Sequence, residues 1–458
     1  MASLASAPGT AGDWVYDGST NGDEMGYAVA TAGDINGDGY DDLVVGAPGA
    51  QDLVYREGVA SLFYGGPGGL ATTPAWKLGG GQQGSRFGAA VAAAGDLNGD
   101  GYGDLVVGAA EYNNGTTKTG AAMVFYGSRD GLSSTPDWSF ISPYRDSNLG
   151  HAVAGGGDLN GDGYDDLLIG ARWYPGTLDK EGGVLIFYGS EGGLPAAPDL
   201  LLAGGQAGAG LGSAVAGGGD VNGDGYADLL AGASTYDFNG ADAGTAALYL
   251  GGPSGLAATP AWTAYGEQEG AWFGSAVALA SDVNGDGYND LVVGAPGDGI
   301  RVTLGALYVY HGSDTGPGEH PDVVITAGEP HSNFGSSLAP AGDLDGDGHD
   351  DVLAGAHRET YDQRLDGVAL LYFGSPAGLQ LTPGWVQSGD KAEACYGFAV
   401  GSAGRPDHTG LPAIAVGAPE YKRDEKTPVG RAFVHYGPLE PRARSHIWLP
   451  LIVREAIP

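Results

Sequence analysis

The chain has 458 residues and a formal net charge of −36, because 56 Asp and Glu residues face only 20 Lys and Arg residues. So acidic a chain offers no basic stripe to a nucleic-acid backbone, and anionic lipid surfaces repel it. The charge therefore argues against a nucleic-acid partner. No apolar run is long enough to cross a membrane, so we expect no membrane span. Its 88 Gly, its 26 Pro and its hydrophobic content of 42% predict short strands and tight turns around a sizeable core.

The two ends of the chain fall outside the repeat described next. Met1 to Gly12 contain neither the basic nor the apolar region of a secretion signal, and we assign residues 1–13 to an N-terminal segment. Residues 438–458 form a C-terminal tail with an apolar patch, His446–Val453. We expect this patch to dock on the folded body, with a trimmed attachment segment as the alternative.

One unit recurs seven times between residues 14 and 437, at a period of 61 or 62 residues. A Gly-Ala pair follows an aliphatic run at Gly46, Gly108, Gly170, Gly232, Gly294, Gly355 and Gly417. An aromatic-rich strand ends at Gly65, Gly127, Gly189, Gly251, Gly312, Gly374 and Gly437. The third marker is a large apolar residue at Trp14, Trp76, Trp138, Leu200, Trp262, Val323 and Trp385.

Each unit predicts four short strands, which in the first unit span about residues 24–33, 42–47, 59–64 and 73–78. No segment sustains the 3.6-residue period of an amphipathic helix. Seven such units predict an all-β, seven-bladed β-propeller over residues 14–437, with a linear solenoid as the alternative. Trp14 precedes the first full unit, and the seventh unit lacks its own outer strand. We therefore expect the Trp14 strand to complete the last blade and close the ring.

Six units carry an acidic loop, Asp-x-Asn-Gly-Asp-Gly-Tyr-x-Asp or a close variant, between their first and second strands. Oxygens at positions 1, 3, 5 and 9 and the backbone carbonyl at position 7 can surround one hard cation, and this donor set favours Ca²⁺ over Mg²⁺. Asp-Gly turns without a metal are the alternative. The predicted ligands are Asp34, Asn36, Asp38, Tyr40, Asp42; Asp96, Asn98, Asp100, Tyr102, Asp104; Asp158, Asn160, Asp162, Tyr164, Asp166; Asp220, Asn222, Asp224, Tyr226, Asp228; Asp282, Asn284, Asp286, Tyr288, Asp290; and Asp343, Asp345, Asp347, His349, Asp351.

These loops are not EF-hands, and the seventh unit has lost the pattern. An EF-hand needs an acid at position 12, where the first loop has Val45 within a predicted strand. The seventh unit places Arg405, Asp407, Thr409 and Ala413 at positions 1, 3, 5 and 9. We therefore predict six Ca²⁺ sites, in blades 1–6, and none in blade 7. In that loop we expect Arg405 to pair with Asp407.

Further motifs flank the acidic loops: Phe87-Gly88, Phe273-Gly274 and Phe334-Gly335 before them, and Gly46-Ala47-Pro48, Gly294-Ala295-Pro296 and Gly417-Ala418-Pro419 after them. The chain in this respect resembles FG-GAP repeat proteins, and in particular the seven-bladed propeller of integrin α-subunit heads. The resemblance implies calcium in the loops of one face and partner recognition on the opposite face. It also implies only three or four calcium-loaded blades, whereas six loops here have side chains suited to bind calcium. The integrin inserted domain, leg domains and membrane span have no counterpart in this sequence.

The connections between the second and third strands of the units break the repeat and hold ten of the 20 basic residues. Exposed aromatic and arginine side chains are enriched at binding hot spots, whereas ordinary solvated loops are the alternative explanation. The candidate partner-binding residues are Tyr55, Tyr112, Trp173, Tyr174, Tyr236, Phe238, Arg358, Tyr361 and Tyr421.

The sequence thus predicts a non-catalytic, calcium-binding propeller that acts as a scaffold for protein recognition or cell adhesion. A lectin-like propeller that binds a glycan ligand through loop aromatic and Asn or Asp residues is the alternative. A polysaccharide-active enzyme is disfavoured because the nine His residues stand singly and the dense carboxylates belong to the metal loops. Sites of this kind fill at extracellular calcium levels, so we expect a secreted or cell-surface protein, although this chain shows no signal peptide.

Overall fold

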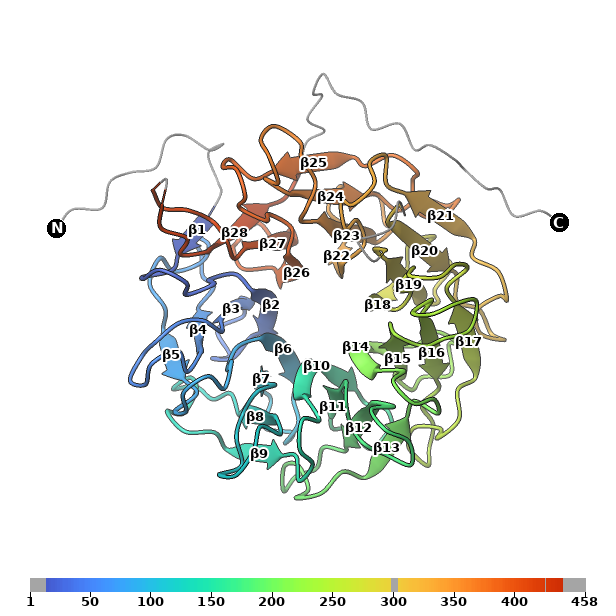
Figure 1. Ribbon diagram of the computed structural model, residues 1–458, viewed down its shortest axis with the longest axis horizontal. Helices are drawn as coiled ribbons and strands as arrows, with labels where there is room; N and C mark the ends of the chain where they lie inside the picture. Colours follow the sequence, from blue (N-terminus) through green and yellow to red (C-terminus); the bar gives the residue numbers. More distant parts are fainter. Residues whose placement is uncertain (1–13, 298–303, 425, 440–458) are drawn as a thin grey trace.

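A computed structural model describes residues 14–297, 304–424 and 426–439. These residues form 28 strands in seven four-stranded antiparallel sheets, which are arranged as blades around a central axis (Figure 1). The described residues contain no helix, and so none that could cross a membrane. The predicted seven-bladed, all-β propeller is confirmed. The expected docking of His446–Val453 concerns residues outside the described ranges.

Each blade runs from an inner strand at the axis to an outer strand at the rim. The first three blades are β2 (Ala28–Gly33), β3 (Asp42–Ala47), β4 (Val59–Phe63), β5 (Trp76–Gly79); β6 (Ala90–Gly95), β7 (Asp104–Ala109), β8 (Ala121–Phe125), β9 (Trp138–Ile141); and β10 (Leu149–Gly157), β11 (Asp166–Ala171), β12 (Gly183–Phe187), β13 (Leu200–Ala203). The next three are β14 (Leu211–Gly219), β15 (Asp228–Ala233), β16 (Thr245–Tyr249), β17 (Trp262–Tyr265); β18 (Ala276–Ser281), β19 (Asp290–Ala295), β20 (Ala306–Tyr310), β21 (Val323–Thr326); and β22 (Ser337–Gly342), β23 (Asp351–Ala356), β24 (Val368–Tyr372), β25 (Trp385–Ser388).

The last blade joins the two ends of the chain. Its strands follow the order β1 (Trp14–Asp17), β28 (Arg431–Tyr436), β27 (Ala413–Ala418) and β26 (Ala399–Gly404), so the predicted closure by the Trp14 strand is confirmed. In Figure 1 the blue first strand lies beside the red last strand. Arg431 reinforces this pair through both guanidinium edges, with Nη2 2.9 Å from Asp17 Oδ2. A bidentate arginine–carboxylate pair fixes geometry as well as adding energy.

The predicted strand boundaries in the first unit agree with the structure to within one residue, except at two starts. The inner strand begins at Ala28 rather than at residue 24, because the chain turns at Glu24 and Gly26, whose φ values are 58° and 81°. The outer strand begins at Trp76 rather than at residue 73. Pro74 lies in between and has no N–H to contribute to a ladder.

Blades bury their faces against one another, which explains the repeated apolar markers. Each second strand is buried along its whole length, as in β3 and β7. The indole of Trp14 packs edge-on against Phe63 of the next blade, and its Nε1 donates to Ala71 O at 2.9 Å. Trp76 repeats both contacts one blade further, against Phe125 and Ser133 O. The apolar markers therefore recur along the sequence because the same contact between neighbouring blades recurs around the ring.

The Gly-Ala marker has an equally direct cause. A Cβ built on Gly46 would overlap the carbonyl oxygen of Gly88, the glycine of the Phe-Gly pair in the next blade. The same overlap recurs around the ring, up to Gly417, whose Cβ would meet Gly26 O. The two glycines of the motif are thus the two sides of one close backbone approach between neighbouring blades.

Candidate calcium sites and the opposite face

The acidic loops connect the inner strand of a blade to its second strand, and they share one hydrogen-bonding scheme. In the third blade, Asp158 Oδ2 accepts the N–H of Gly163 at 2.9 Å, and Asn160 Oδ1 accepts the N–H of Asp162 at 2.9 Å. Asp162 Oδ1 accepts the N–H of Tyr164 at 3.1 Å. Each of these oxygens keeps a second lone pair. The backbone thus wraps around its own side-chain oxygens and gathers the donors predicted for a cation.

The aspartate at position 9 of each loop is fully buried and accepts backbone hydrogen bonds beneath the loop. Asp166 starts β11, and its two oxygens accept the N–H groups of Leu159 at 2.8 Å and Gly189 at 2.9 Å. Burial raises the pKa of Asp166 to about 7, with Asp162 and Asp158 adding to the rise and the two backbone hydrogen bonds opposing it. The pKa rises to about 7 also in Asp42, Asp104 and Asp351, and to about 6 in Asp228 and Asp290.

The sixth loop gives the clearest donor cluster. Carboxylate oxygens of Asp343, Asp345 and Asp347 all lie within 4.8 Å of one another. The first five loops have Asn where this loop has Asp345, so an amide oxygen replaces one carboxylate there. Carboxylates this close repel each other in the absence of a cation. The donor set of oxygen atoms therefore fits a hard divalent cation such as Ca²⁺.

The seventh loop differs from the prediction in one respect. Arg405 and Asp407 do not form the expected ion pair within 4.0 Å, since Asp407 Oδ1 instead accepts the N–H and the hydroxyl of Thr409, the former at 2.8 Å. The Arg405 backbone N–H donates to Asp41 Oδ2 of the first blade at 2.7 Å. A short Asp-Thr turn and a neighbouring blade, rather than an internal charge pair, support this loop.

The ring at position 7 has a role that the sequence analysis missed. Tyr226 lies over the third loop from the next blade, where a Cβ on Gly161 would come within 2.5 Å of its Cε1 atom. The same overlap joins Gly37 to Tyr102, Gly99 to Tyr164, Gly223 to Tyr288 and Gly285 to His349. The joint recurrence of glycine at position 4 and an aromatic ring at position 7 was the available signal. Only the juxtaposition of blades reveals what it means.

Position 8 carries a second contact between blades that was missed. The N–H of Asp165 donates to Asp96 O at 3.1 Å, and the Asp165 carboxylate accepts the N–H of Asp96 at 2.7 Å. Asn289 binds Asp220 in the same reciprocal manner. Gly103 and Ala227 occupy this position in two other blades and provide the backbone bond alone. The acidic loops are therefore linked to one another around the face.

The predicted partner-binding residues lie on the opposite face but differ in exposure. Tyr55 and Phe238 expose 61% and 60% of their surface, and Arg358 is exposed as well. Trp173 is half-buried. Four others are half-buried and pack against core clusters of the blades, namely Tyr112, Tyr174, Tyr236 and Tyr361.

Tyr421 is a correction to this set. It is only 2% exposed and belongs to a core cluster, with its ring 3.9 Å from the Arg431 guanidinium carbon. Its hydroxyl donates to Asp390 Oδ2 at 3.2 Å. A residue enclosed in this way supports the last blade and cannot contact a partner, so we remove it from the candidate surface.

Buried carboxylates support several loops of this face. Glu57 is 1% exposed, and its Oε1 accepts the N–H groups of Leu53 and Val54 at 2.6 and 2.7 Å, while its Oε2 accepts that of Gly81 at 2.7 Å. Burial alone would raise the pKa of Glu57, but these backbone hydrogen bonds outweigh it and the pKa is lowered. Asp366 binds three backbone N–H groups in the sixth blade.

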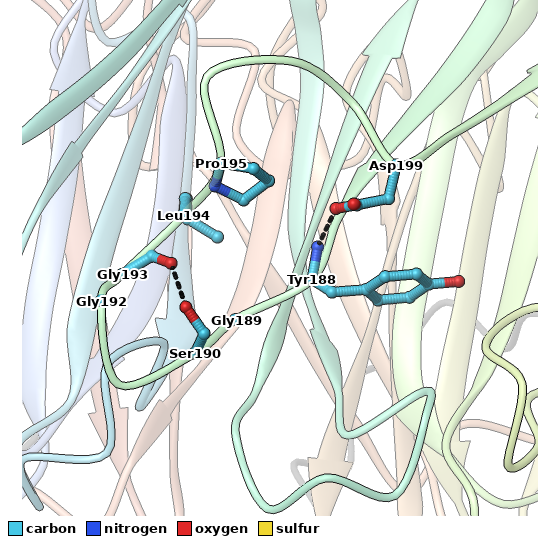
Figure 2. Close-up of a pocket in the computed structure, with 8 residues that line it drawn as sticks. All are labelled: Tyr188, Gly189, Ser190, Gly192, Gly193, Leu194, Pro195 and Asp199. Carbon is cyan, nitrogen blue, oxygen red and sulfur yellow. Dashed lines mark hydrogen bonds between the residues drawn. The ribbon is translucent and has the colours of Figure 1, made fainter.

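A pocket of about 450 Å³ lies at the turn between β12 and β13, on the side of the acidic loops (Figure 2). Its polar groups already have partners. Asp199 Oδ2 accepts the N–H of Tyr188 at 2.9 Å, and the Ser190 hydroxyl donates to Gly193 O at 2.7 Å. The lining therefore presents no nucleophile paired with a base.

Comparison with known proteins agrees with this geometry. The chain matches the FG-GAP repeat over residues 25–62, 87–125, 149–187, 211–249, 273–310 and 334–370. It is 40% identical to integrin alpha-IIb of Mus musculus, over 32% of this chain and 15% of that protein. With integrin alpha-5 of Xenopus laevis the identity is 32%, over 50% of this chain and 21% of that protein.

A third relative has the name of an enzyme. Phosphatidylinositol-glycan-specific phospholipase D of Bos taurus is 40% identical, over 36% of this chain and 20% of that protein. The chain spans less than a quarter of the length of each of these relatives. Six matched repeats that cover half of the chain, the close approach of the motif glycines and the seven-bladed ring together show that this chain belongs to the FG-GAP repeat family.

Proposed function

We propose that this propeller is a non-catalytic, calcium-stabilised recognition module that acts outside the cell in protein binding or adhesion. The observation that carries the proposal is the sixfold recurrence of one oxygen-rich loop, with the same donors in the same backbone wrap. Asp-Gly turns alone would not require a buried, desolvated carboxylate beneath each loop. A cation offsets the cost of burying that charge.

In each of the six loops, the side chains at positions 1, 3, 5 and 9 and the carbonyl at position 7 would hold the ion. The ion would neutralise the clustered carboxylates and fix the loop between neighbouring blades. Six Ca²⁺ ions would change the net charge of the chain from −36 to about −24. Calcium sites of low affinity are occupied at the millimolar calcium concentration of the extracellular space, which supports a secreted or surface location.

Calcium binding is tested by titration calorimetry and equilibrium dialysis on the full chain. We expect six Ca²⁺ per chain, and five in the Asp162→Asn variant. The matched control is Asp407→Asn in the seventh loop, which should leave six. No binding at millimolar Ca²⁺, or the same loss in both variants, would contradict the assignment of the sites.

The recognition function is tested on an array of extracellular proteins with the chain loaded with calcium. Tyr55 and Phe238 are the most exposed aromatic candidates, so the double variant Tyr55→Ser, Phe238→Ser should lose capture while it keeps its fold. Leu201→Ser on the outer strand β13, 38% exposed, is the control that should retain capture. Binding to a glycan array with no protein captured would favour the lectin-like alternative instead.

A further inference from the structure

An arginine that forms no ion pair with any residue the structure describes lies in the β11–β12 connection of the third blade, residues 172–182. Arg172 directly follows the Gly170-Ala171 pair, at the position that Pro48, Pro296 and Pro419 occupy in other units. Its Nε atom is buried and has no hydrogen-bond partner. Within the described ranges its guanidinium forms no ion pair within 4.0 Å.

The position of Arg172 is fixed by its neighbours. Its guanidinium carbon lies 4.5 Å from the centroid of the Trp173 ring, and Lys180 Nζ lies 6.0 Å from the same ring. On the other side, a Cβ on Gly210 of the fourth blade would be 3.5 Å from Arg172 Cγ and 3.6 Å from Trp173 Cζ3. The arginine is thus held in place by packing, and a stacked guanidinium loses little entropy when it binds a ligand.

The surroundings leave this positive charge only partly compensated. Burial lowers the pKa of Arg172, and Asp242 of the fourth blade opposes that shift electrostatically without an ion pair. Burial, and then the Arg172 charge, lower the pKa of His151 to about 4, so this neighbouring imidazole is neutral near pH 7. Burying a charge without a partner costs free energy.

Two other arginines of this face, by contrast, form ion pairs in the structure. Arg86 lies 3.2 Å from Glu24, and Arg364 lies 2.8 Å from Glu393. In a chain with 56 acidic residues, it is unexpected that a half-buried guanidinium, oriented by Trp173 and with its Nε atom buried, lacks a carboxylate. The missing partner is therefore most simply supplied by another molecule.

We propose that Arg172, backed by Trp173 and Lys180, is the receptor for a single carboxylate, an Asp or Glu side chain of the protein that binds this face. This inference rests on the proposed recognition function and adds the chemistry of the contact. The planar guanidinium fork matches a carboxylate in a bidentate pair. A polyanion is a poorer ligand, because Asp179, Asp242 and the net charge of the chain repel it beyond the one contact.

The contact can be tested on the calcium-loaded full chain with acetate as the probe, by following arginine Nε–H resonances in ¹⁵N NMR spectra near pH 6.5. The Arg172→Lys variant assigns the resonance. We expect acetate to shift it saturably, while chloride at equal ionic strength does not. Arg129, exposed at the acidic-loop side of the second blade, is the matched control and should show no saturable shift. An Arg172 resonance that acetate leaves unchanged, or that chloride shifts equally, would overturn the carboxylate site.

The failure of this inference can be told apart from failure of the recognition function. For any protein captured on the array, Arg172→Gln should raise the dissociation constant at least tenfold, whereas Arg129→Gln should raise it less than twofold. If Arg172→Gln does not change capture, the proposed carboxylate contact is wrong, but the recognition function is not contradicted. An array without captured protein removes the recognition function, whereas the acetate titration still decides whether Arg172 binds carboxylates.

Discussion

The two faces of this propeller follow opposite rules. On the acidic-loop face, six blades repeat the same wrap and the same buried aspartate, and five of the six loops have an aromatic ring of the next blade over them. On the opposite face, each connection has its own support, such as Glu57 in the first blade and Asp366 in the sixth. The repeated face shows what every blade needs in order to fold. The irregular face contains what this one protein does differently, including an arginine that stability alone does not explain.

Removal of calcium should have the largest effect, because it acts on all six repeated loops together. A ligand that binds only the folded state adds about 2.7 kcal/mol per site at a hundredfold excess over its dissociation constant. We expect the thermal midpoint in chelator to lie far below that in millimolar Ca²⁺. Magnesium at equal concentration is the control and should restore only part of the shift. Identical melts in chelator and in calcium would mean that the loops fold without the ion.

A substitution at position 4 of a loop should be the most harmful single change on the repeated face. Gly161→Ala combines a φ of +75° with a Cβ 2.5 Å from Tyr226, and overpacking costs about 1–3 kcal/mol. Gly163→Ala in the same loop is the matched control, since its φ is +91° but no atom lies within 4 Å of the added Cβ. It should lose only the backbone cost, about 1–2 kcal/mol. Urea denaturation that gives equal losses would refute the contact between blades.

Glu57→Gln probes the support of a single irregular loop and should cost about 1–3 kcal/mol at pH 7, since it leaves buried N–H groups poorly matched. Because the folded-state pKa of Glu57 is lowered, its stabilisation is present above the pKa of the unfolded chain and is lost as the pH falls through the folded value. The difference in unfolding free energy between wild type and variant should therefore be constant from pH 8 to 6 and shrink below about pH 4.5. Exposed Glu191→Gln should show no difference at any pH.

The smallest effect on stability is expected at Arg172. Arg172→Gln removes a half-buried charge that has no ion pair among the described residues, so we expect a change within about 0.5 kcal/mol, or a gain in stability. Arg431→Gln is the contrasting variant, because it breaks the pair with Asp17 that joins the first strand to the last. A loss at Arg172 as large as that at Arg431 would mean that the guanidinium is structural, and the contrast between the faces would weaken.

Most of the fold could be predicted from the sequence, because the features that define it repeat. The Gly-Ala pairs and the Trp strands mark interfaces between blades, and the offset of Trp14 reveals the closure that β1 makes with β28. The six acidic loops were found for the same reason.

The predictions that proved wrong concern segments that do not follow the repeat. Tyr421 was assigned to the surface because it lies in an irregular connection, yet its ring packs under Arg431. Arg405 was paired with Asp407 by charge alone, whereas the local turn lets Thr409 bind that carboxylate first. In both regions, the direction of a side chain depends on the neighbouring blade, and no single-unit pattern encodes it.

The closure of the ring also fixes how the molecule would respond to mechanical load. Trp14 pairs with Val434 and Asp17 with Arg431, so the entering and leaving ends of the chain meet at one end of a four-residue ladder. Tension applied between those ends would open the ladder pair by pair from Trp14, rather than shear it. A tether at one end alone would leave the seam unstrained. Tension between the two ends of the chain would therefore act first on the joint between the first and last strands.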